Sequence, residues 1–386
     1  MKPAPHLMIV TLMMSQGTTG VQTHFNAIAQ YAASQGVKVS IVEPYQFNRW
    51  IRKIPGAINR LLNRINLEWA VLVNRGFMYR LQKSLLRDAL SAAKDEAIVV
   101  YAQDPLSAKT ALDLRQEGFN FRLVGVIHFN ISEALENVER GISEKNGKLW
   151  HNLMENERNV LPKLDQIVFV SSFMQQVVGA RLPALAGVPQ VVISNFPAIS
   201  GGSTLSKASV SGDLIAIGTL EPRKNQGFLL QILAECNAKG KRYSLTVVGD
   251  GLDRTVLEQQ VANLGLVGQV SFLGYQPDAA RLISGHKVFV HASRMESQGI
   301  VLLEALRAAV PVFAAPVGGI PEVFKDGQEG FYFDLDNPRD AAEKLISILE
   351  DHQKWRQMSI SAQTTYNSRF HPDLLGKRWI NTLLGT

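Results

Sequence analysis

The sequence predicts an α/β protein made of two doubly wound domains, each with a parallel sheet covered by helices on both faces. Short apolar runs alternate with helix-length segments through most of the 386 residues. These runs are almost continuously hydrophobic, which is typical of strands buried on both faces. The alternation starts again after 198–212, a stretch rich in Ser and Gly that we interpret as a linker. We therefore expect two domains of ordinary size that face each other across a cleft.

The strands of the first half are expected at 7–13, 37–42, 97–101, 122–127, 166–170 and 191–194. Helical patterns between them include 21–34, 105–117 and 173–182. The second half predicts strands at 214–218, 244–249, 270–273, 288–291, 312–314 and 330–333. Its helices are expected at 226–239, 252–263, 279–285, 299–309 and 338–351. We place the domains at 1–200 and 201–365, with C-terminal helices at 366–386 that cross back to the first domain and pack at the domain junction.

Composition excludes several classes of protein. The chain is 46% hydrophobic and 19% charged, so it can bury cores and is not disordered. Its single cysteine, Cys236, excludes an internal disulfide and fits a reducing compartment. The run 7–14 is preceded by Lys2 alone and lacks a small-residue cleavage site, so we interpret it as a strand and not as a signal peptide. No apolar run approaches the ~18 residues of a membrane span, which predicts a cytoplasmic protein or one on a membrane surface.

Ligands of open α/β sheets bind beyond the carboxyl ends of the strands, so the residues there are candidates for a functional site. In the first half, "MMSQGTTGVQTHF" places Gly17, Gly20 and Gln22 between a strand and a helix. Such a loop lets a backbone approach a ligand, but an ordinary tight loop is equally consistent with it. Asp104 follows another strand and can instead cap the next helix. His128 ends a third strand, and its alternative is a core histidine bonded to a carbonyl.

In the second half, "IGTLEPRKNQG" places Arg223 and Lys224 just before a helix. Positive charge there does not help the helix, but it suits an anion such as a diphosphate. The alternative is a solvated basic turn. "VVGDG" is similar to the start of a dinucleotide-binding fingerprint, but Arg254 stands where the third glycine belongs. This difference argues against a nicotinamide-dependent dehydrogenase.

Two acids, Glu296 and Glu304, bracket the start of an apolar helix, and the entrance "SQG" offers free N–H groups to a phosphate. Carboxylates accept hydrogen bonds from sugar hydroxyls, so the pair suits two polyols joined by a diphosphate, as in a nucleotide sugar. The alternative is a helix with an exposed glutamate at each end. Gly318, Gly319 and Pro321 form another glycine loop after the next strand.

These residues resemble glycosyltransferase family 4, whose members have the GT-B fold of two Rossmann-like domains. "ESQGIVLLEAL…VPV…APVGGIPEV…DGQEG" is similar to its E-x7-E signature, "GTLEPRKN" to its phosphate loop, and "TGVQTHF" to its first-domain loop, especially that of phosphatidylinositol mannosyltransferases. The second-domain likeness covers most of 213–333, and the first-domain likeness is patchy. Thr219 stands where the family usually has arginine, and Gln298 where it usually has an aromatic residue.

The resemblance implies a metal-independent retaining glycosyltransferase that uses a UDP-sugar or GDP-sugar and no cofactor. Glu304 would bind the ribose, Glu296 the donor sugar, and Lys224 with Arg223 the diphosphate. His128 would touch the donor sugar near the reacting carbon. The implied donor-binding set is completed by Thr219, Gly249, Gly274, Tyr275, Gln298, Gly299, Ile300 and Val301. The implied acceptor-binding set is Gly17, Gly20, Gln22, Asp104 and His128.

Two alternatives to this function remain open. Thr219 and Gln298 motivate a non-catalytic sugar-nucleotide-binding or scaffold subunit. A nucleotide-sugar epimerase shares the architecture but needs acid and base groups that we cannot place.

A basic insert at 45–90 stands apart from the rest of the chain. Within 45–87, nine Arg and Lys residues face a single acid, Glu68, whereas the whole chain carries +6. Ile58, Leu61, Leu62 and Ile65 form an apolar stripe, with Arg60 and Arg64 on another face. This pattern predicts an amphipathic segment on an anionic membrane surface, and hence a glycan or lipid-linked acceptor. The alternative is a helix that covers the first sheet. No nucleic-acid-binding motif accompanies the charge.

Overall fold

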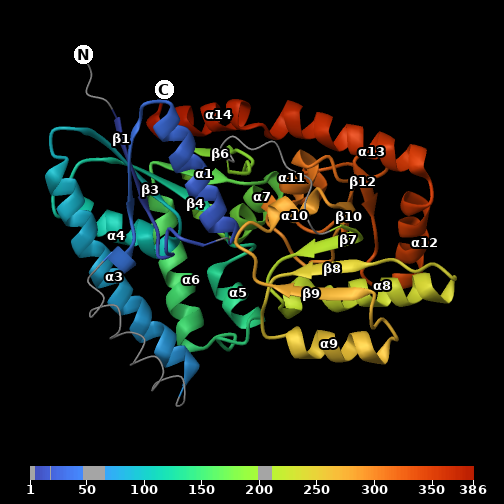
Figure 1. The fold of residues 1–386 in the computed structure, drawn as a ribbon. Helices are drawn as coiled ribbons and strands as arrows, with labels where there is room; N and C mark the ends of the chain where they lie inside the picture. Colours follow the sequence, from blue (N-terminus) through green and yellow to red (C-terminus); the bar gives the residue numbers. More distant parts are fainter. Residues whose placement is uncertain (1–4, 18, 47–65, 199–210) are drawn as a thin grey trace. The chain divides into compact units, whose positions relative to one another are not determined.

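The computed structural model describes residues 5–17, 19–46, 66–198 and 211–386. The chain forms two compact units. Unit 1 comprises Met1–Ile199 and Pro372–Thr386, and unit 2 comprises Ser200–His371. Each unit contains a six-stranded sheet whose strands all pair in parallel, with helices packed against it (Figure 1). The predicted fold class of two doubly wound α/β domains is confirmed.

Unit 1 has the strand order β2-β1-β3-β4-β5-β6. Its strands are β1 Pro5–Val10, β2 Lys38–Val42, β3 Ala97–Ala102, β4 Arg122–Ile127, β5 Gln166–Phe169 and β6 Gln190–Val192. Its helices are α1 Gly20–Ser34, η1 Pro44–Gln46, α3 Leu67–Ala92, α4 Pro105–Gln116, α5 Glu133–Glu139, α6 Lys148–Val160, η2 Leu161–Lys163, α7 Ser172–Arg181, η3 Pro183–Gly187 and α14 Pro372–Leu384. Because β1, β3 and β4 are neighbours, the loops that follow them meet at one edge of the sheet.

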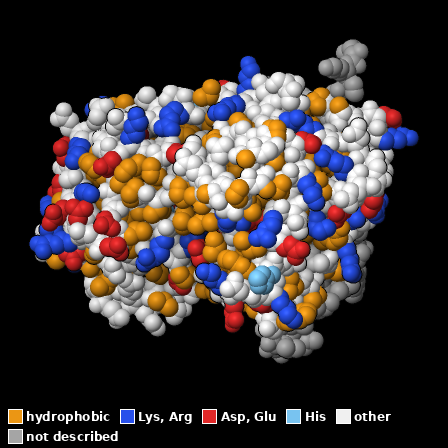
Figure 2. Space-filling model, turned by 180° about the vertical axis from the view of Figure 1, so that it is seen from behind, with side chains coloured by type: hydrophobic (Ala, Val, Ile, Leu, Met, Phe, Trp, Pro, Cys, Tyr) orange, Lys and Arg blue, Asp and Glu red, His pale blue; other side chains and the backbone are white. Residues whose placement is uncertain are grey.

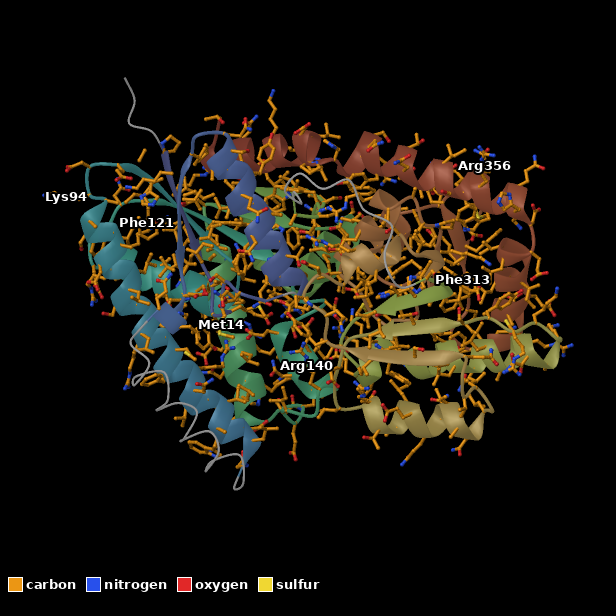
Figure 3. The ribbon with its side chains drawn as sticks, in the orientation of Figure 1. Met14, Lys94, Phe121, Arg140, Phe313 and Arg356 are labelled. Atoms are coloured by element: carbon orange, nitrogen blue, oxygen red, sulfur yellow. The ribbon has the colours of Figure 1, made fainter. Side chains whose placement is uncertain are left out.

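Unit 2 has the strand order β12-β11-β10-β7-β8-β9. Its strands are β7 Gly212–Ile217, β8 Leu245–Val248, β9 Val270–Gly274, β10 His286–His291, β11 Val312–Ala314 and β12 Gly330–Tyr332. Its helices are η4 Pro222–Lys224, α8 Gln226–Ala238, α9 Arg254–Asn263, α10 Ala280–Ile283, α11 Ile300–Arg307, η5 Ile320–Glu322, α12 Pro338–Leu349, α13 His352–Thr365 and η6 Tyr366–Phe370. Phe313 lies in the apolar core of this unit, with its ring 4.6 Å from that of Phe333 (Figure 3).

The helix starts follow local sequence signals. Thr19 and Gln22 form a capping box at α1, in which each side chain bonds the backbone of the other. Asp104 caps α4 by accepting a hydrogen bond from the Ser107 N–H, and Pro105 occupies the first helical position. These caps fix where the loops after β1 and β3 end.

The C-terminal segment differs from the prediction, which began it at residue 366. Helix α13 continues into the π-helical turn Tyr366–Phe370, so unit 2 extends to His371. Pro372 ends this helical run, because proline has no N–H to donate and disfavours a helical conformation of the residue before it. His371 is accordingly extended. Helix α14 then starts afresh and packs against α1 and β3 in unit 1. Its Trp379 is fully buried and donates its indole N–H to the Ser194 carbonyl at 2.9 Å.

The whole apolar stripe predicted in the insert, with Arg60 and Arg64, lies outside the described residues. The described part, α3, is a 26-residue helix that packs against α4 and α6 (Figure 1). Its basic residues are largely paired: Arg75 with Glu133, and both Lys83 and Arg87 with Glu117. Figure 2 shows that blue Lys and Arg side chains on the face it presents are spread among other types and do not form one patch. Within the described residues, no helix is both long and apolar enough to cross a membrane.

Candidate functional site

Glycine-containing turns bring the backbones after β7, β8 and β9 into close contact. The Gly249 N–H donates to the Gly274 carbonyl at 2.9 Å, and the Gly218 N–H donates to the Val248 carbonyl at 3.0 Å. Gly249 has φ +134°, and a Cβ atom there would lie 2.0 Å from the Gly218 oxygen. A side chain at this position is therefore excluded both by its backbone angle and by space. This close packing shapes one edge of the candidate site.

Lys224, Glu296 and His291 form a charged cluster beside these turns. The Lys224 Nζ lies 2.7 Å from Glu296 Oε2, and His291 Nε2 lies 3.3 Å from the same oxygen. Burial alone would raise the pKa of Glu296, but the Lys224 ammonium and the His291 hydrogen bond outweigh it and hold that pKa well below its usual range. Burial lowers the pKa of His291, so this ring is neutral at pH 7. The cluster thus holds a fixed carboxylate and a fixed ammonium side by side.

Backbone contacts tie the loop of Lys224 to the loop of Glu296. The Arg223 carbonyl accepts from the Arg294 N–H at 2.9 Å, and the Arg223 guanidinium donates to the Met295 carbonyl at 3.3 Å. That guanidinium also pairs with Glu221 at 2.8 Å. Arg223 is therefore partly engaged by the protein itself, whereas Lys224 points its ammonium at Glu296.

Two further glycines position Glu296. Its carbonyl accepts a hydrogen bond from the Gly319 N–H at 2.9 Å. Gly318 has φ +59°, and a Cβ atom there would lie 2.0 Å from the same carbonyl oxygen. Gly299, with φ +81°, forms the cap of α11, and a Cβ atom there would lie 3.2 Å from Glu296 Cγ. Close approach to Glu296 thus requires glycine at position 318, and the positive backbone angle favours glycine at position 299.

Glu304 lies within α11 and is half-buried. Burial raises its pKa to about 7, and the opposing charge of Arg307 does not compensate. A carboxylate in this environment is costly unless a ligand bonds it. Hydroxyl groups of a bound ligand would supply such hydrogen bonds.

Replacing Glu304 by glutamine should stabilise the free protein in alkaline solution. The folded state holds a proton on Glu304 up to about pH 7, whereas the unfolded chain releases it near the ordinary glutamate pKa of 4.5. The native state therefore binds more protons in this window, and wild-type stability falls as pH rises through it. Glutamine cannot ionise, so E304Q should have the higher Tm at about pH 8 and a similar Tm at about pH 4. Equal melting temperatures of the wild type and E304Q in alkaline solution would show that burial of the Glu304 carboxylate does not destabilise the free protein.

The other residues of the predicted donor set lie at the same end of this sheet. Thr219 is exposed in the turn after β7, and Tyr275 follows β9 with 57% of its surface exposed. Gln298 is buried just before α11, and Ile300 and Val301 form the first turn of that helix. The structure thus brings the set together within unit 2, and the role of each residue stays a prediction.

In unit 1, Gln22 holds the loop after β1. Its amide nitrogen donates to the carbonyls of Met14 and Gln16 at 2.8 and 3.1 Å, and its oxygen accepts from the Thr19 N–H at 3.1 Å. Gly17 lies against this amide, while a Cβ atom at Gly20 would meet open space. Gln22 is itself buried, so its observed contacts shape the loop. Met14 on this loop is 45% exposed (Figure 3).

Asp104 acts as the helix cap that the sequence allowed. Its carboxylate accepts from the Ser107 N–H at 2.8 Å and from the Leu12 N–H at 3.2 Å. Burial raises its pKa, and the Ser107 bonds oppose that increase. Asp104 therefore joins the loops after β1 and β3, and its acceptor contact stays a prediction.

His128 belongs to a polar cluster that sequence reasoning missed. Its Nε2 lies 3.1 Å from Gln103 Oε1, and its ring packs edge-on against His24 with centroids 4.8 Å apart. His24 Nε2 lies 2.6 Å from the Tyr101 hydroxyl. Since His24 and Tyr101 stand in apolar helix and strand patterns, no local signal distinguished them from core residues. His291 was likewise interpreted simply as a strand end.

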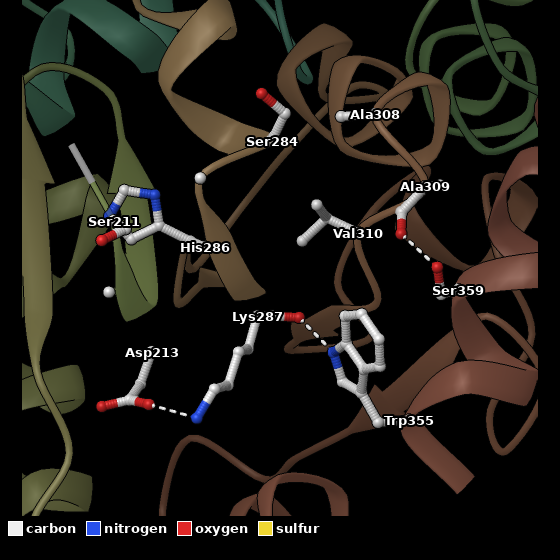
Figure 4. A pocket seen from close by; sticks show the side chains of 12 residues that line it. Ser211, Asp213, Ser284, His286, Lys287, Ala308, Ala309, Val310, Trp355 and Ser359 are labelled. Carbon is white, nitrogen blue, oxygen red and sulfur yellow. Dashed lines mark hydrogen bonds and ion pairs between the residues drawn. The ribbon is translucent and has the colours of Figure 1, made fainter. Parts of the chain in front are cut away.

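A pocket of about 550 Å³ opens at the opposite end of the unit 2 strands, near the starts of β7 and β10 (Figure 4). Its polar groups bond one another: Lys287 pairs with Asp213 at 2.9 Å, and the Lys287 carbonyl accepts from the Trp355 indole at 2.7 Å. The predicted site residues follow the opposite ends of the strands, so this pocket contains none of them. Among the described residues, no group of three or more His, Cys, Asp or Glu side chains is arranged to hold a metal ion.

Part of the chain is similar in sequence to known proteins. Residues 207–365 match the family model described as glycosyl transferases group 1. An N-acetyl-alpha-D-glucosaminyl L-malate synthase of Bacillus anthracis is 34% identical over 143 residues, which cover 37% of this chain and 36% of the relative. A phosphatidyl-myo-inositol mannosyltransferase of Mycolicibacterium smegmatis is 34% identical over 136 residues, which cover 34% of each chain. These matches span about a third of the relatives' own lengths.

The match to a solved structure extends over both units. The Anabaena protein Alr3699/HepE, solved with UDP-glucose, superimposes with a TM-score of 0.67 at 19% identity and covers 98% of this chain and 100% of its own. At this identity the likeness shows a shared fold. Residues 207–365 thus resemble glycosyl transferases group 1, and the two units share their fold with this solved structure.

Proposed function

We propose that the protein is a retaining glycosyltransferase of family 4 that moves a sugar from a nucleotide-diphosphate donor to a hydroxyl of a glycan or lipid-linked acceptor. The observation that carries the proposal is the Lys224–Glu296 pair at 2.7 Å, set among glycine turns at the carboxyl ends of the unit 2 strands. A neighbouring carboxylate and ammonium suit a ligand that has both hydroxyls and phosphates.

Each part of the donor then has a partner. The sugar hydroxyls bond to Glu296, and the ribose hydroxyls bond to Glu304. The diphosphate lies against Lys224 and the N-terminus of α11, where the N–H groups of Ile300 and Val301 point out of the helix. Bonding by the ribose offsets the burial cost of the Glu304 carboxylate, so E304A should weaken nucleotide binding as well.

In the reaction, negative charge develops on the departing diphosphate. A fixed ammonium and a helix N-terminus stabilise that charge without reorganisation, and this type of interaction is the main source of catalysis in many enzymes. These groups take the part that a metal ion plays elsewhere, so we propose that transfer is metal-independent. With no strong nucleophile identified from the sequence, the acceptor hydroxyl attacks on the face that the diphosphate leaves and gives its proton to that phosphate. The anomeric configuration is retained.

Unit 1 contributes the acceptor-binding loops in this proposal. Gly17, Gly20 and Gln22 form the loop after β1, and Asp104 and His128 follow the neighbouring strands β3 and β4. The acceptor is a glycan or a lipid-linked sugar, and the product contributes to envelope polysaccharide or glycolipid. The likeness to a phosphatidyl-myo-inositol mannosyltransferase supports glycolipid as the product.

Turnover with a panel of UDP-sugars and GDP-sugars tests the function. Release of nucleotide diphosphate, with and without EDTA, should occur with one nucleotide class and should increase when a matching acceptor is added. NMR of the product reports whether the anomeric configuration is kept. Binding of a nucleotide sugar without any release would favour the scaffold alternative that Thr219 and Gln298 suggest. Release of an epimerised free sugar would favour an epimerase.

Contact with an anionic membrane surface is the second part of the proposal, and it places the protein at the cytoplasmic face of a membrane. It rests on the basic, apolar sequence of 45–90. Reversing the charge of Arg60 and Arg64 to glutamate should reduce binding to vesicles that contain phosphatidylglycerol, since each basic residue near such a surface adds about 1 kcal/mol. Reversal of the exposed Arg356 and Arg378 in unit 2 and α14 is the matched control. Equal sedimentation of both variants with vesicles would remove the membrane proposal.

A further inference from the structure

The ring of His128 is held by a buried polar cluster in unit 1. Gln103, which follows β3, is 3% exposed and places its Oε1 3.1 Å from His128 Nε2. An amide oxygen accepts hydrogen bonds and cannot donate them. A hydrogen bond between these two atoms therefore requires the histidine proton to be on Nε2.

Tyr101 belongs to the same buried cluster. Its hydroxyl lies 2.6 Å from His24 Nε2, and burial raises its pKa well above the usual value. The Gln103 nitrogen makes no hydrogen bond of ordinary geometry to the described residues, so the Gln103 amide is held through its oxygen, on His128.

The cluster also holds His128 in its neutral form. Burial lowers the pKa of His128 well below its usual value, and the neighbouring His24 lowers it further. Burial likewise lowers the pKa of His24 to about 3. Trp379 closes this side of the cluster, with its ring 4.8 Å from that of His24. His128 itself is partly exposed, so its ring is within reach of a ligand.

We propose that Gln103 is a positioning residue that fixes His128 as the Nε2–H tautomer, so that Nδ1 offers a lone pair to a hydroxyl group of the substrate. A lone pair accepts a hydrogen bond from a hydroxyl group and repels a phosphate or carboxylate oxygen. The inference rests on the proposed function for its substrate, but the tautomer itself does not. His128 thus binds a sugar hydroxyl and leaves phosphate binding to other residues.

Nitrogen-15 NMR of the full-length protein, labelled at histidine and free of ligands, tests the tautomer directly. His128 is assigned by the loss of its signals in H128N. In the wild type we expect a proton on Nε2 and no titration between about pH 5 and pH 8. In Q103L both tautomers should be populated. In Q103E the carboxylate should bring titration of His128 into that pH range.

Q82L is the matched control, since Gln82 is a buried glutamine of unit 1 that bonds the Thr11 carbonyl and the Ser107 hydroxyl. It should lose stability while the His128 signals keep their wild-type shifts. A proton on Nδ1 in the wild type, or an unchanged His128 spectrum in Q103L, would overturn the proposal.

Activity provides the second readout. In Q103E, kcat/KM should fall about tenfold for each pH unit below the new pKa of His128 and should recover in alkaline solution. A merely structural role for Gln103 would lower kcat/KM equally at every pH, and that outcome would also overturn the proposal. If the wild-type protein turns over no nucleotide sugar, the proposed function fails while the NMR result still decides the tautomer.

Discussion

Replacing Lys224 by alanine should reduce kcat/KM by about 10²–10³-fold, the usual effect of removing one group that stabilises a developing negative charge. Lys224 is the partner of Glu296 in a mostly buried pair, so K224A removes a charge from the diphosphate and also leaves a carboxylate without its cation. The free protein should therefore lose stability as well. Binding of the donor should no longer raise the Tm, because a ligand stabilises a protein in proportion to its affinity for the folded state.

The control for K224A is K239A. Lys239, in the same unit, pairs with Glu343 at 2.7 Å, but these side chains are 31% and 56% exposed, against 15% and 12% for Lys224 and Glu296. Exposed ion pairs contribute about 0–1 kcal/mol, so K239A should keep the wild-type turnover and the wild-type thermal shift with donor. If K224A bound and turned over the donor as well as K239A does, the diphosphate role of Lys224 would be wrong.

Gly318 is the second position where a small change should have a large effect. In G318A the new Cβ atom would lie 2.0 Å from the Glu296 carbonyl oxygen, and the backbone angle of +59° is itself unfavourable for alanine. The angle alone costs about 1–2 kcal/mol, and relief of the clash must displace the backbone of Glu296. We therefore expect G318A to lose more stability than the angle explains and to lose most of its affinity for the donor.

Gly327 separates these two effects. It has φ +76° in the same unit, and a Cβ atom there would meet nothing within 4 Å. G327A should thus lose only the cost of the backbone angle and should keep its donor affinity. Urea unfolding gives the free energy of each variant, and titration calorimetry gives the affinity. If G318A and G327A lost the same free energy of unfolding and the same donor affinity, contact with Glu296 would not constrain position 318.

The fold was predictable because buried parallel strands leave a direct trace in the sequence. The run 97–101 is continuously apolar and 122–127 is apolar after Arg122, and the structure forms β3 and β4 there. Helix α3 was harder to predict, because its many basic residues suggested a surface segment. Its arginines and lysines are partly neutralised by acids from distant helices, Glu133 and Glu117, and such pairings leave no local pattern.

The position of the candidate residues was predictable for those in short loops that follow a strand, and their roles stay predictions. Gly299, Gly318 and Lys224 stand in loops whose spacing is fixed by short connections. His24 and Gln103 were not predictable, because they reach His128 only when α1, β3 and β4 are packed together. His291 was not predictable either. It ends strand β10, and no pattern in the sequence indicates that its ring contacts Glu296 in the loop that follows.

The discontinuity of unit 1 has a consequence for the synthesis of the protein. A ribosome releases the chain from its N-terminus, and domains generally fold as they emerge. Unit 2 is encoded in one stretch, 200–371, and can complete its core while α14 is still inside the exit tunnel. Unit 1 appears first but must wait for Trp379, the side chain that packs against His24. The half of the molecule that is translated first is therefore the half that completes its core last.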